Sequence, residues 1–247
     1  MTIGALIYGA VALYAIGLVL YLLKREQLSF GALGIGFAAH TAYQIWRAWL
    51  GGVFIPNGMV DGVFLLPWAI AGVIILLRLF GDRGTGWLSG LVPLVIFGVF
   101  ALVYPKGMIP PTPNKLTLWA PTFFFTEAIG HACFYLGAWY ALQSIINKSE
   151  TGAFHMVVVW GFVAYSLSQI VGAIWAYNGW ATTFRWGSRH LQSAVIWCFY
   201  ATYLHLRYMP GWGMRARARY AAVGFVVVAL CTFGSHLNEM RFPRIGG

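Results

Sequence analysis

The chain has 247 residues, of which 60% are hydrophobic and only 9% are charged, and its formal net charge is +10. A soluble domain carries about 25% charged residues, so a chain this poor in charge cannot cover a water-facing surface. The 16 lysines and arginines are scattered over expected loops and helix ends. That distribution is typical of lipid headgroup contacts and topology signals, and it argues against nucleic-acid binding.

Apolar stretches of about 20 residues follow one another along the chain, and each can cross a hydrocarbon core about 30 Å thick as a helix. The alternating strands of a membrane barrel are not seen in the sequence. We therefore predict an all-α, polytopic helical bundle that forms one membrane domain over residues 1–247, with the first span retained. Its eight expected spans are 4–23, 29–50, 59–80, 86–104, 119–146, 154–176, 190–209 and 217–236.

Two connections between the expected spans are long. Residues 105–118 are proline-rich, which excludes helix there, and residues 177–189 are polar and aromatic. The second belongs to a tryptophan-rich loop over residues 175–189. The arginines of the segment RARAR at 215–219 form the densest cationic cluster, and the positive-inside rule places it on the inner side. Both termini and both long connections are then expected outside.

Three cysteines, Cys133, Cys198 and Cys231, lie inside apolar segments and form no CxxC pair. The sequence therefore offers no thioether haem-attachment motif and no thiol redox pair. Small side chains that pack between helices are the simplest interpretation.

The histidines are the informative polar residues, because a polar ring inside lipid is costly without a partner. His40, His131 and His205 lie inside the second, fifth and seventh expected spans. Neutral imidazoles on facing helices can form a low-spin bis-histidine haem site. The alternative for each is a structural histidine that is hydrogen-bonded between helices. Three more histidines lie near helix ends and could be interfacial: His155, His190 and His236.

Two acids lie at or inside the outer halves of spans. Asp61 lies near the start of the third span and Glu127 lies in the fifth. Either could carry protons or bind a quinol hydroxyl, and either could be an interfacial acid paired with a neighbour. An aromatic group at Trp175, Trp180, Phe184 and Trp186 could stack on a porphyrin or form part of an interfacial aromatic belt.

Residues 172–207, GAIWAYNGWATTFRWGSRHLQSAVIWCFYATYLHLR, resemble the tryptophan-rich signature and following YLHxR motif of the cytochrome c assembly family (the CcsA/ResC and CcmC haem-handling proteins). AAHTAYQIWRAWLGG, with Pro56, Asp61 and Trp68 after it, resembles an early span of that family, and IGHACFYLGAWYAL at 129–142 resembles another. The resemblance covers the chain from about residue 29 onward, and eight spans fit the CcsA branch better. The matches in the first segment are Gly172, Ala173, Trp175, Ala176, Trp180, Trp186, Trp197, Tyr203, Leu204, His205 and Arg207.

The resemblance implies that His40 and His205 hold a haem b within the bilayer. It also implies a second histidine pair in the outer loops, which would hold the haem that is to be attached to an apocytochrome. Here this sequence departs from the family. Phe123 or Phe124 replaces one loop histidine of the family. The position of the family's last outer histidine falls about seven residues beyond His236, where only Pro243 is near. Four signature residues are also replaced, by Gly187, Ser188, Arg189 and His190.

A second haem on the outer side, held by a pair drawn from His131, His190 and His236, is a hypothesis. The first functional hypothesis is a transmembrane electron-transfer subunit of the bacterial inner membrane. It would be the membrane part of a quinol-linked oxidoreductase and pass electrons from quinone to a periplasmic multihaem cytochrome or other redox subunit. The second is a haem transport or delivery protein for cytochrome c biogenesis, in which Trp175, Trp180 and Trp186 stack on haem. The third is a structural subunit without haem.

Overall fold

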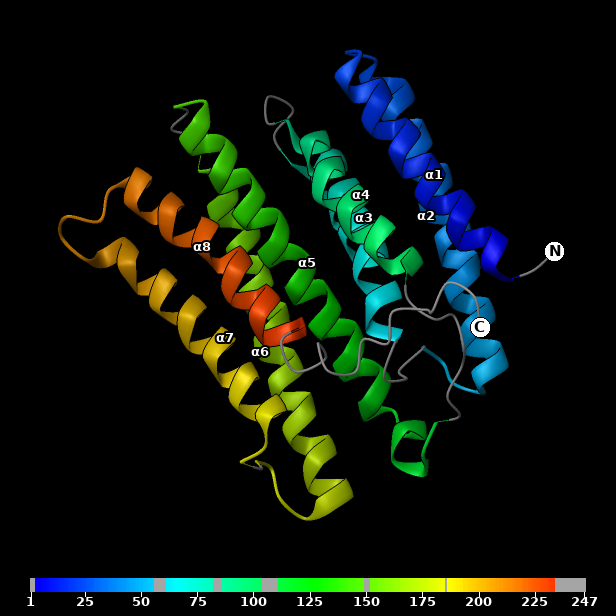
Figure 1. The fold of residues 1–247 in the computed structure, drawn as a ribbon. Helices are drawn as coiled ribbons and strands as arrows, with labels where there is room; N and C mark the ends of the chain where they lie inside the picture. Colours follow the sequence, from blue (N-terminus) through cyan, green and yellow to red (C-terminus); the bar gives the residue numbers. More distant parts are fainter. Residues whose placement is uncertain are drawn as a thin grey trace. The chain divides into compact units, whose positions relative to one another are not determined.

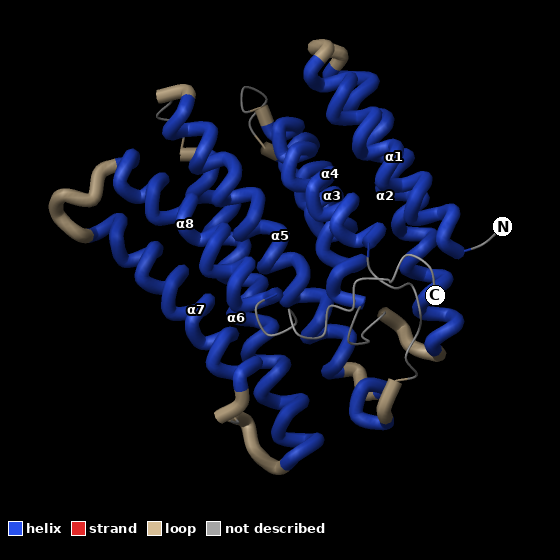
Figure 2. The backbone as a smooth tube through the Cα atoms, in the orientation of Figure 1, coloured by secondary structure: helices blue, strands red, loops and turns tan. Residues whose placement is uncertain are grey.

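The computed structural model describes residues 3–55, 61–81, 86–103, 111–148, 152–184 and 186–233. Within these ranges all regular structure is helical (Figure 2), so the predicted all-α fold is confirmed. The chain is a polytopic helical membrane protein. The helices in chain order are α1 Ile3–Leu22, α2 Glu26–Gly51, α3 Asp61–Phe80, α4 Leu91–Val103, α5 Trp119–Ile146, α6 Ala153–Trp180, α7 Ser188–His205 and α8 Met214–Phe233 (Figure 1).

The described ranges also contain the short 3-10 helices η1 Trp87–Gly90, η2 Pro113–Leu116 and η3 Leu206–Tyr208. Four helices of the described part are long and apolar enough to cross a membrane by themselves. The segment Trp87–Val103, which joins η1 to α4, is apolar but shorter. The count of eight spans and the outward placement of both termini stay predictions.

Several expected boundaries differ from the helix ends by a few residues, and the end of α6 matters most for the candidate site. Helix α6 runs to Trp180, four residues beyond the expected end at 176, so Trp175 and Trp180 lie on a helix and not on a loop. The polar residues after 176 do not interrupt the helix, because the segment contains no proline to break it. Ala181 ends the helix in a left-handed conformation (φ 55°), and its N–H donates to the Tyr177 carbonyl. Helices α6 and α7 thus contain most of residues 172–207.

The chain divides into two compact units, Met1–Ala128 with Phe242–Gly247, and Ile129–Arg241. Residues 242–247 lie outside the described ranges. The boundary falls inside α5. The expected single membrane domain stays a prediction, and each unit is described by itself.

The first unit is built around the contact of α1 with α2. Gly36 lets the helices approach, because a Cβ there would lie 2.8 Å from the Tyr14 ring. The buried Ser29 hydroxyl donates to the Gly17 carbonyl at 2.8 Å across the same contact. Small residues and interhelical hydrogen bonds commonly stabilise the association of helices in lipid.

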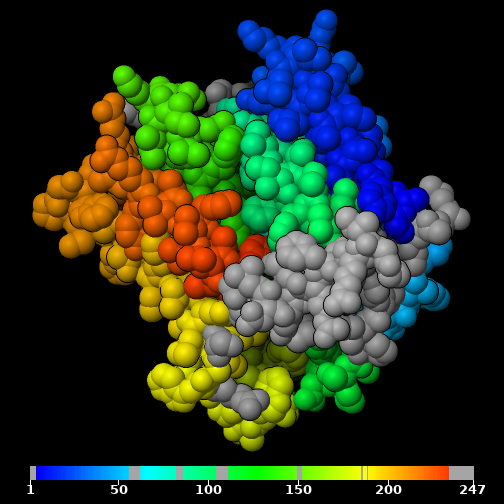
Figure 3. Space-filling model, viewed as in Figure 1, coloured from blue at the N-terminus to red at the C-terminus, as the bar shows by residue number. Residues whose placement is uncertain are grey.

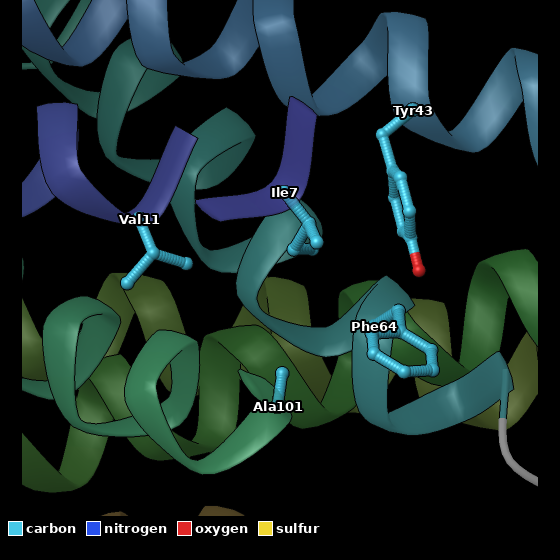
Figure 4. Close-up of a cluster of buried hydrophobic side chains, with 5 residues drawn as sticks. All are labelled: Ile7, Val11, Tyr43, Phe64 and Ala101. Carbon is cyan, nitrogen blue, oxygen red and sulfur yellow. The ribbon is translucent and has the colours of Figure 1, made fainter. Parts of the chain in front are cut away.

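Helices α3 and α4 complete this unit. Helix α4 contacts both α1 and α3, and the surfaces of α1 and α4 adjoin in the space-filling view (Figure 3). A buried cluster joins all four helices, and Tyr43 of α2 points toward Phe64 of α3 within it (Figure 4). The cluster consists of Ile7, Val11, Tyr43, Phe64 and Ala101.

The second unit contains α5 from residue 129 onward, with α6, α7 and α8. Glycines bring α5 and α6 close together, since a Cβ at Gly130 would lie 2.9 Å from Tyr165 Cβ and one at Gly137 would lie 2.6 Å from Val158. Phe134 of α5 stacks on Tyr200 of α7 with ring centroids 3.6 Å apart and an interplanar angle of 4°. Close backbone approach and flat aromatic contact therefore define this unit.

Candidate functional site

His40 lies on α2 in the first unit and is fully buried. Its Nε2 lies 3.4 Å from the Gln44 amide nitrogen, and its Nδ1 lies 3.3 Å from the Tyr14 hydroxyl. The Gln44 amide nitrogen is a donor, so Nε2 accepts and Nδ1 carries the proton that it donates to Tyr14. The same amide group also donates to the Phe64 carbonyl at 2.8 Å. Both contacts to the ring are long for hydrogen bonds.

The polar residues of α2 continue along one helical face from His40. Tyr43, Gln44 and Arg47 follow it at positions three, four and seven residues further on, and all are buried. Such a spacing places side chains above one another on a helix. The Arg47 guanidinium lies 4.8 Å from the Phe64 ring centroid and 3.3 Å from the Tyr43 hydroxyl. A buried cation and a neutral imidazole thus share one face of this membrane helix.

His205 is the last residue of α7 in the second unit, and its side chain is exposed. Its Nδ1 lies 2.7 Å from the Ala201 carbonyl, four residues earlier in the same helix. A carbonyl only accepts, so Nδ1 carries the proton and the lone pair of the neutral ring is on Nε2. Metal-binding histidines commonly have this arrangement, in which the second ring nitrogen is held by a carbonyl.

His155 lies near the start of α6, and the structure gives it specific partners. Its Nδ1 lies 3.0 Å from the Tyr203 hydroxyl, and its Nε2 lies 3.5 Å from an Arg207 guanidinium nitrogen. The sequence marks Tyr203 and Arg207 only as parts of the YLHxR motif. Nothing in their spacing along the chain could bring them to His155, because 48 and 52 residues separate them from it.

His131 is buried on α5, and its ring lies 5.3 Å from the Tyr165 ring of α6. Glu127 is half-buried, four residues earlier on α5. Asp61 is the first residue of α3, and its side chain lies outside the described part. His236 also lies outside the described residues. The proposed pairing of His131 with His236 therefore stays a hypothesis.

The aromatic residues form two local groups in the second unit. Trp175 and Trp180 meet edge to face on α6, with ring centroids 5.8 Å apart. Phe184 meets Trp186 and His190 at the start of α7, each with centroids 5.3 Å apart. Trp186 is 86% exposed. The structure thus brings His190 to part of the predicted aromatic group.

Residues 126–240 match the family model described as Cytochrome C assembly protein. This part of the chain is therefore similar to the cytochrome c assembly family. Similar curated proteins include the cytochrome c biogenesis protein CcsA of Prochlorococcus marinus subsp. pastoris. It is 40% identical over 158 residues, which cover 61% of this chain and 50% of that protein. CcsA of Prochlorococcus marinus strain MIT 9515 is 40% identical over 88 residues, which cover 36% of this chain and 28% of that protein.

CcsA of Oryza sativa is 26% identical over 142 residues, which cover 54% of this chain and 44% of that protein. The chain thus spans about half, or less, of the length of the curated relatives it matches. The matched family region includes α6, α7 and the described part of α8. It therefore contains His205 and both aromatic groups, while His40 lies before it.

The donor chemistry of both histidines fits a haem iron. In each ring the hydrogen-bond network puts the proton on Nδ1 and leaves the lone pair on Nε2. The exposed side chain of His205 can present its Nε2 lone pair to an iron without rearrangement. At His40 the Gln44 amide would have to leave Nε2 before a metal could bind there. The two residues belong to different units.

Proposed function

We propose that this chain is a haem-handling membrane protein of cytochrome c biogenesis. The match of residues 126–240 to the family model supports this role, and the relatives named above carry the description cytochrome c biogenesis protein. The observation that carries the proposal is at His205. This histidine lies in the matched region, its Nδ1 is held by a backbone carbonyl, and its side chain is exposed.

Haem b is the proposed cofactor, with His40 and His205 as its axial ligands. When bound, it would supply an iron centre whose potential depends on these ligands and on their hydrogen-bond partners. Tyr14 would accept the Nδ1 proton of His40, and the Ala201 carbonyl would do the same for His205. The chain would then hold both rings in the tautomer that presents Nε2 to a metal.

The second aromatic group is the proposed contact for the haem in transit. Phe184 packs against both Trp186 and His190, and the exposed face of Trp186 is available for stacking. Aromatic rings prefer offset or edge-to-face contact at the spacing seen here. His190 would be the nearest imidazole to such a haem. The outer location of this group, in a bacterial inner membrane, belongs to the proposal.

The direct test is the haem content of purified variants. Protein in mild detergent is analysed by pyridine haemochrome and by a reduced-minus-oxidised difference spectrum. We expect His40→Ala and His205→Ala each to lose the resident haem b. His155→Ala is the matched control, because this histidine also contacts a tyrosine hydroxyl and we expect it to leave the haem in place. Full haem content in both single variants would contradict the proposed ligand pair.

Electron transfer is the second candidate. The departures from the family signature at Gly187, Ser188, Arg189 and His190 favour it, because they affect the delivery site and leave His40 and His205 intact. The comparisons favour biogenesis, and quinone binding with Asp61 or Glu127 as proton acceptor gains no support from them.

Two assays separate the candidates. Expression of the chain in a cell that lacks its CcsA relative should restore covalent cytochrome c formation if the chain delivers haem. Rapid reduction of a stoichiometric haem by a quinol analogue, without such restoration, would establish the electron-transfer role. The partner of the delivery role would be an apocytochrome c, and that of the electron-transfer role a periplasmic redox protein such as a multihaem cytochrome.

A further inference from the structure

Three helix ends of the second unit meet around His155. A Cβ at Gly152, which precedes α6, would lie 3.6 Å from the methyl group of Met214, the first residue of α8. An Arg217 guanidinium nitrogen lies 4.0 Å from the Met214 sulfur. His155 on α6 contacts Tyr203 at the end of α7. The starts of α6 and α8 and the end of α7 therefore form one side-chain cluster.

The cluster is cationic, and no acid balances it among the described residues of the second unit. Arg207 lies on η3, and Arg215, Arg217 and Arg219 lie in the first two turns of α8. The described residues of that unit contain neither aspartate nor glutamate, and the sequence has none between 151 and 238. Glu150, two residues before Gly152, lies outside the described residues. No ion pair of Arg207 or Arg217 occurs in the described part, where their side-chain contacts are His155 and Met214.

Some N–H donors of this cluster are not used by the hydrogen bonds of His155. Arg207 can only donate to His155 Nε2, so the His155 proton is on Nδ1 and points to Tyr203. The remaining N–H groups of the Arg207 guanidinium are not used by His155. At the start of α6 the residue before the helix is Gly152, which has no side chain to cap the first N–H groups. These N–H groups add a weak positive potential to the arginines.

The residues around this cluster are of the types that gather at the level of lipid headgroups. Tyr208 and Met209 are exposed apolar residues beside Arg207, and Trp212 lies in the same turn between α7 and α8. The Trp212 ring contacts Tyr220 of α8 edge to face, with centroids 6.1 Å apart. Tryptophan and tyrosine gather at the membrane interface because one part of the ring is apolar and another is polar.

We propose that Arg207 and Arg217 bind the phosphate group of an anionic membrane lipid. Guanidinium groups recognise phosphate through paired N–H donors. Neither arginine makes an ion pair in the described part of the chain, so both can bind an external anion. A soluble phosphate has the same anionic chemistry. The exposed apolar side chains around the cluster favour the lipid, because acyl chains would cover Tyr208 and Met209. This site is separate from the proposed haem function and stands without it.

The test is native mass spectrometry of the whole chain purified in detergent. The protein is titrated in parallel with phosphatidylglycerol and with phosphatidylcholine of the same acyl chains. We expect the wild type to retain phosphatidylglycerol in preference. Arg207→Gln and Arg217→Gln should each weaken retention about fivefold, since one arginine near a charged surface contributes on the order of 1 kcal/mol. Arg217→Lys keeps the charge and should retain most of the preference.

Arg189→Gln is the matched control, because it removes one arginine at the opposite end of α7. We expect it to leave lipid retention unchanged. Equal retention of both lipids by the wild type, or an equal loss in the control, would overturn the proposal. In a competition experiment, inorganic phosphate or glycerol phosphate is added at millimolar concentration. Displacement of the lipid at such concentrations would assign the site to a soluble anion. Haem content is measured in every variant, and loss of haem together with lipid in both Arg217 variants would also overturn it.

Discussion

Tyr14 is the residue that accepts the proton of the His40 ring. The Tyr14 hydroxyl lies 3.3 Å from His40 Nδ1, and the Tyr14 ring is fully buried beside Gly36. Sequence reasoning identified His40 as a candidate ligand from its position within an apolar span. It could not identify Tyr14, because 26 residues separate the two and only the packing of α1 on α2 brings them together.

Tyr14→Phe keeps the ring and removes the acceptor of the Nδ1 proton. A buried donor without its acceptor costs about 1–3 kcal/mol, so thermal unfolding in detergent should shift to lower temperature. If His40 is a haem ligand, loss of this acceptor makes the imidazole less basic, and the midpoint potential of the haem should rise. Redox titration and thermal denaturation of the same preparation measure the two effects.

Tyr21→Phe is the control for this substitution, since Tyr21 lies on the same helix, two turns from Tyr14. We expect it to leave the midpoint potential unchanged. A potential that does not move in Tyr14→Phe, while the unfolding temperature falls, would mean that His40 is structural and that another residue holds the haem.

Ser29 makes the hydrogen bond that joins α1 to α2. Its hydroxyl is buried and donates to the Gly17 carbonyl at 2.8 Å. We expect Ser29→Ala to lower stability by about 0.6 kcal/mol, the average for interhelical hydrogen bonds in a membrane protein. Ser193→Ala is the control, because no hydrogen bond of the Ser193 side chain occurs in the described part. Unfolding in a denaturing detergent compares them, and equal stabilities would show that this bond contributes nothing.

At the scale of helices, Gly130 sets the distance between α5 and α6. A Cβ there would meet Tyr165 Cβ at 2.9 Å and the Tyr165 backbone nitrogen at 3.1 Å. A backbone atom cannot move aside without shifting the helix, so Gly130→Ala should destabilise the protein by about 1–3 kcal/mol. Gly31→Ala is the control, since a Cβ there meets nothing within 4 Å and alanine favours helix. A stability of Gly130→Ala equal to that of the control would contradict this packing.

Helix bounds were mostly predictable from the sequence. The expected span at 119–146 agrees with α5 at both ends, because apolar runs and flanking polar residues determine where a helix can lie in lipid. The end of α6 was not predictable, because Asn178 and Gly179 look like loop residues although the helix continues to Trp180. Helix-to-helix contacts, such as Phe134 on Tyr200, depend on three-dimensional packing and leave no local signal.

For the whole molecule, orientation in the membrane is what connects the candidate sites to function. The arginines at 215, 217 and 219 begin α8, directly after the turn that contains Trp212. Three positive charges within five residues strongly favour retention on the cytoplasmic side. If this turn is inside, the loop at the other end of α7, with Phe184 and Trp186, faces outward. His205 would then lie near the inner surface and the second aromatic group near the outer one.

Alkaline phosphatase fusions test this orientation, because the enzyme is active only when exported. A fusion after Phe184 should be active and one after Trp212 inactive. Replacing Arg215, Arg217 and Arg219 together by glutamine should raise the activity of a fusion placed after α8's first turns, since the retention signal is then lost. The reversed pattern in the unmodified chain would place the second aromatic group inside. Haem delivery to an exported apocytochrome from that group would then be impossible, whereas the contacts of His40 and His205 would be unaffected.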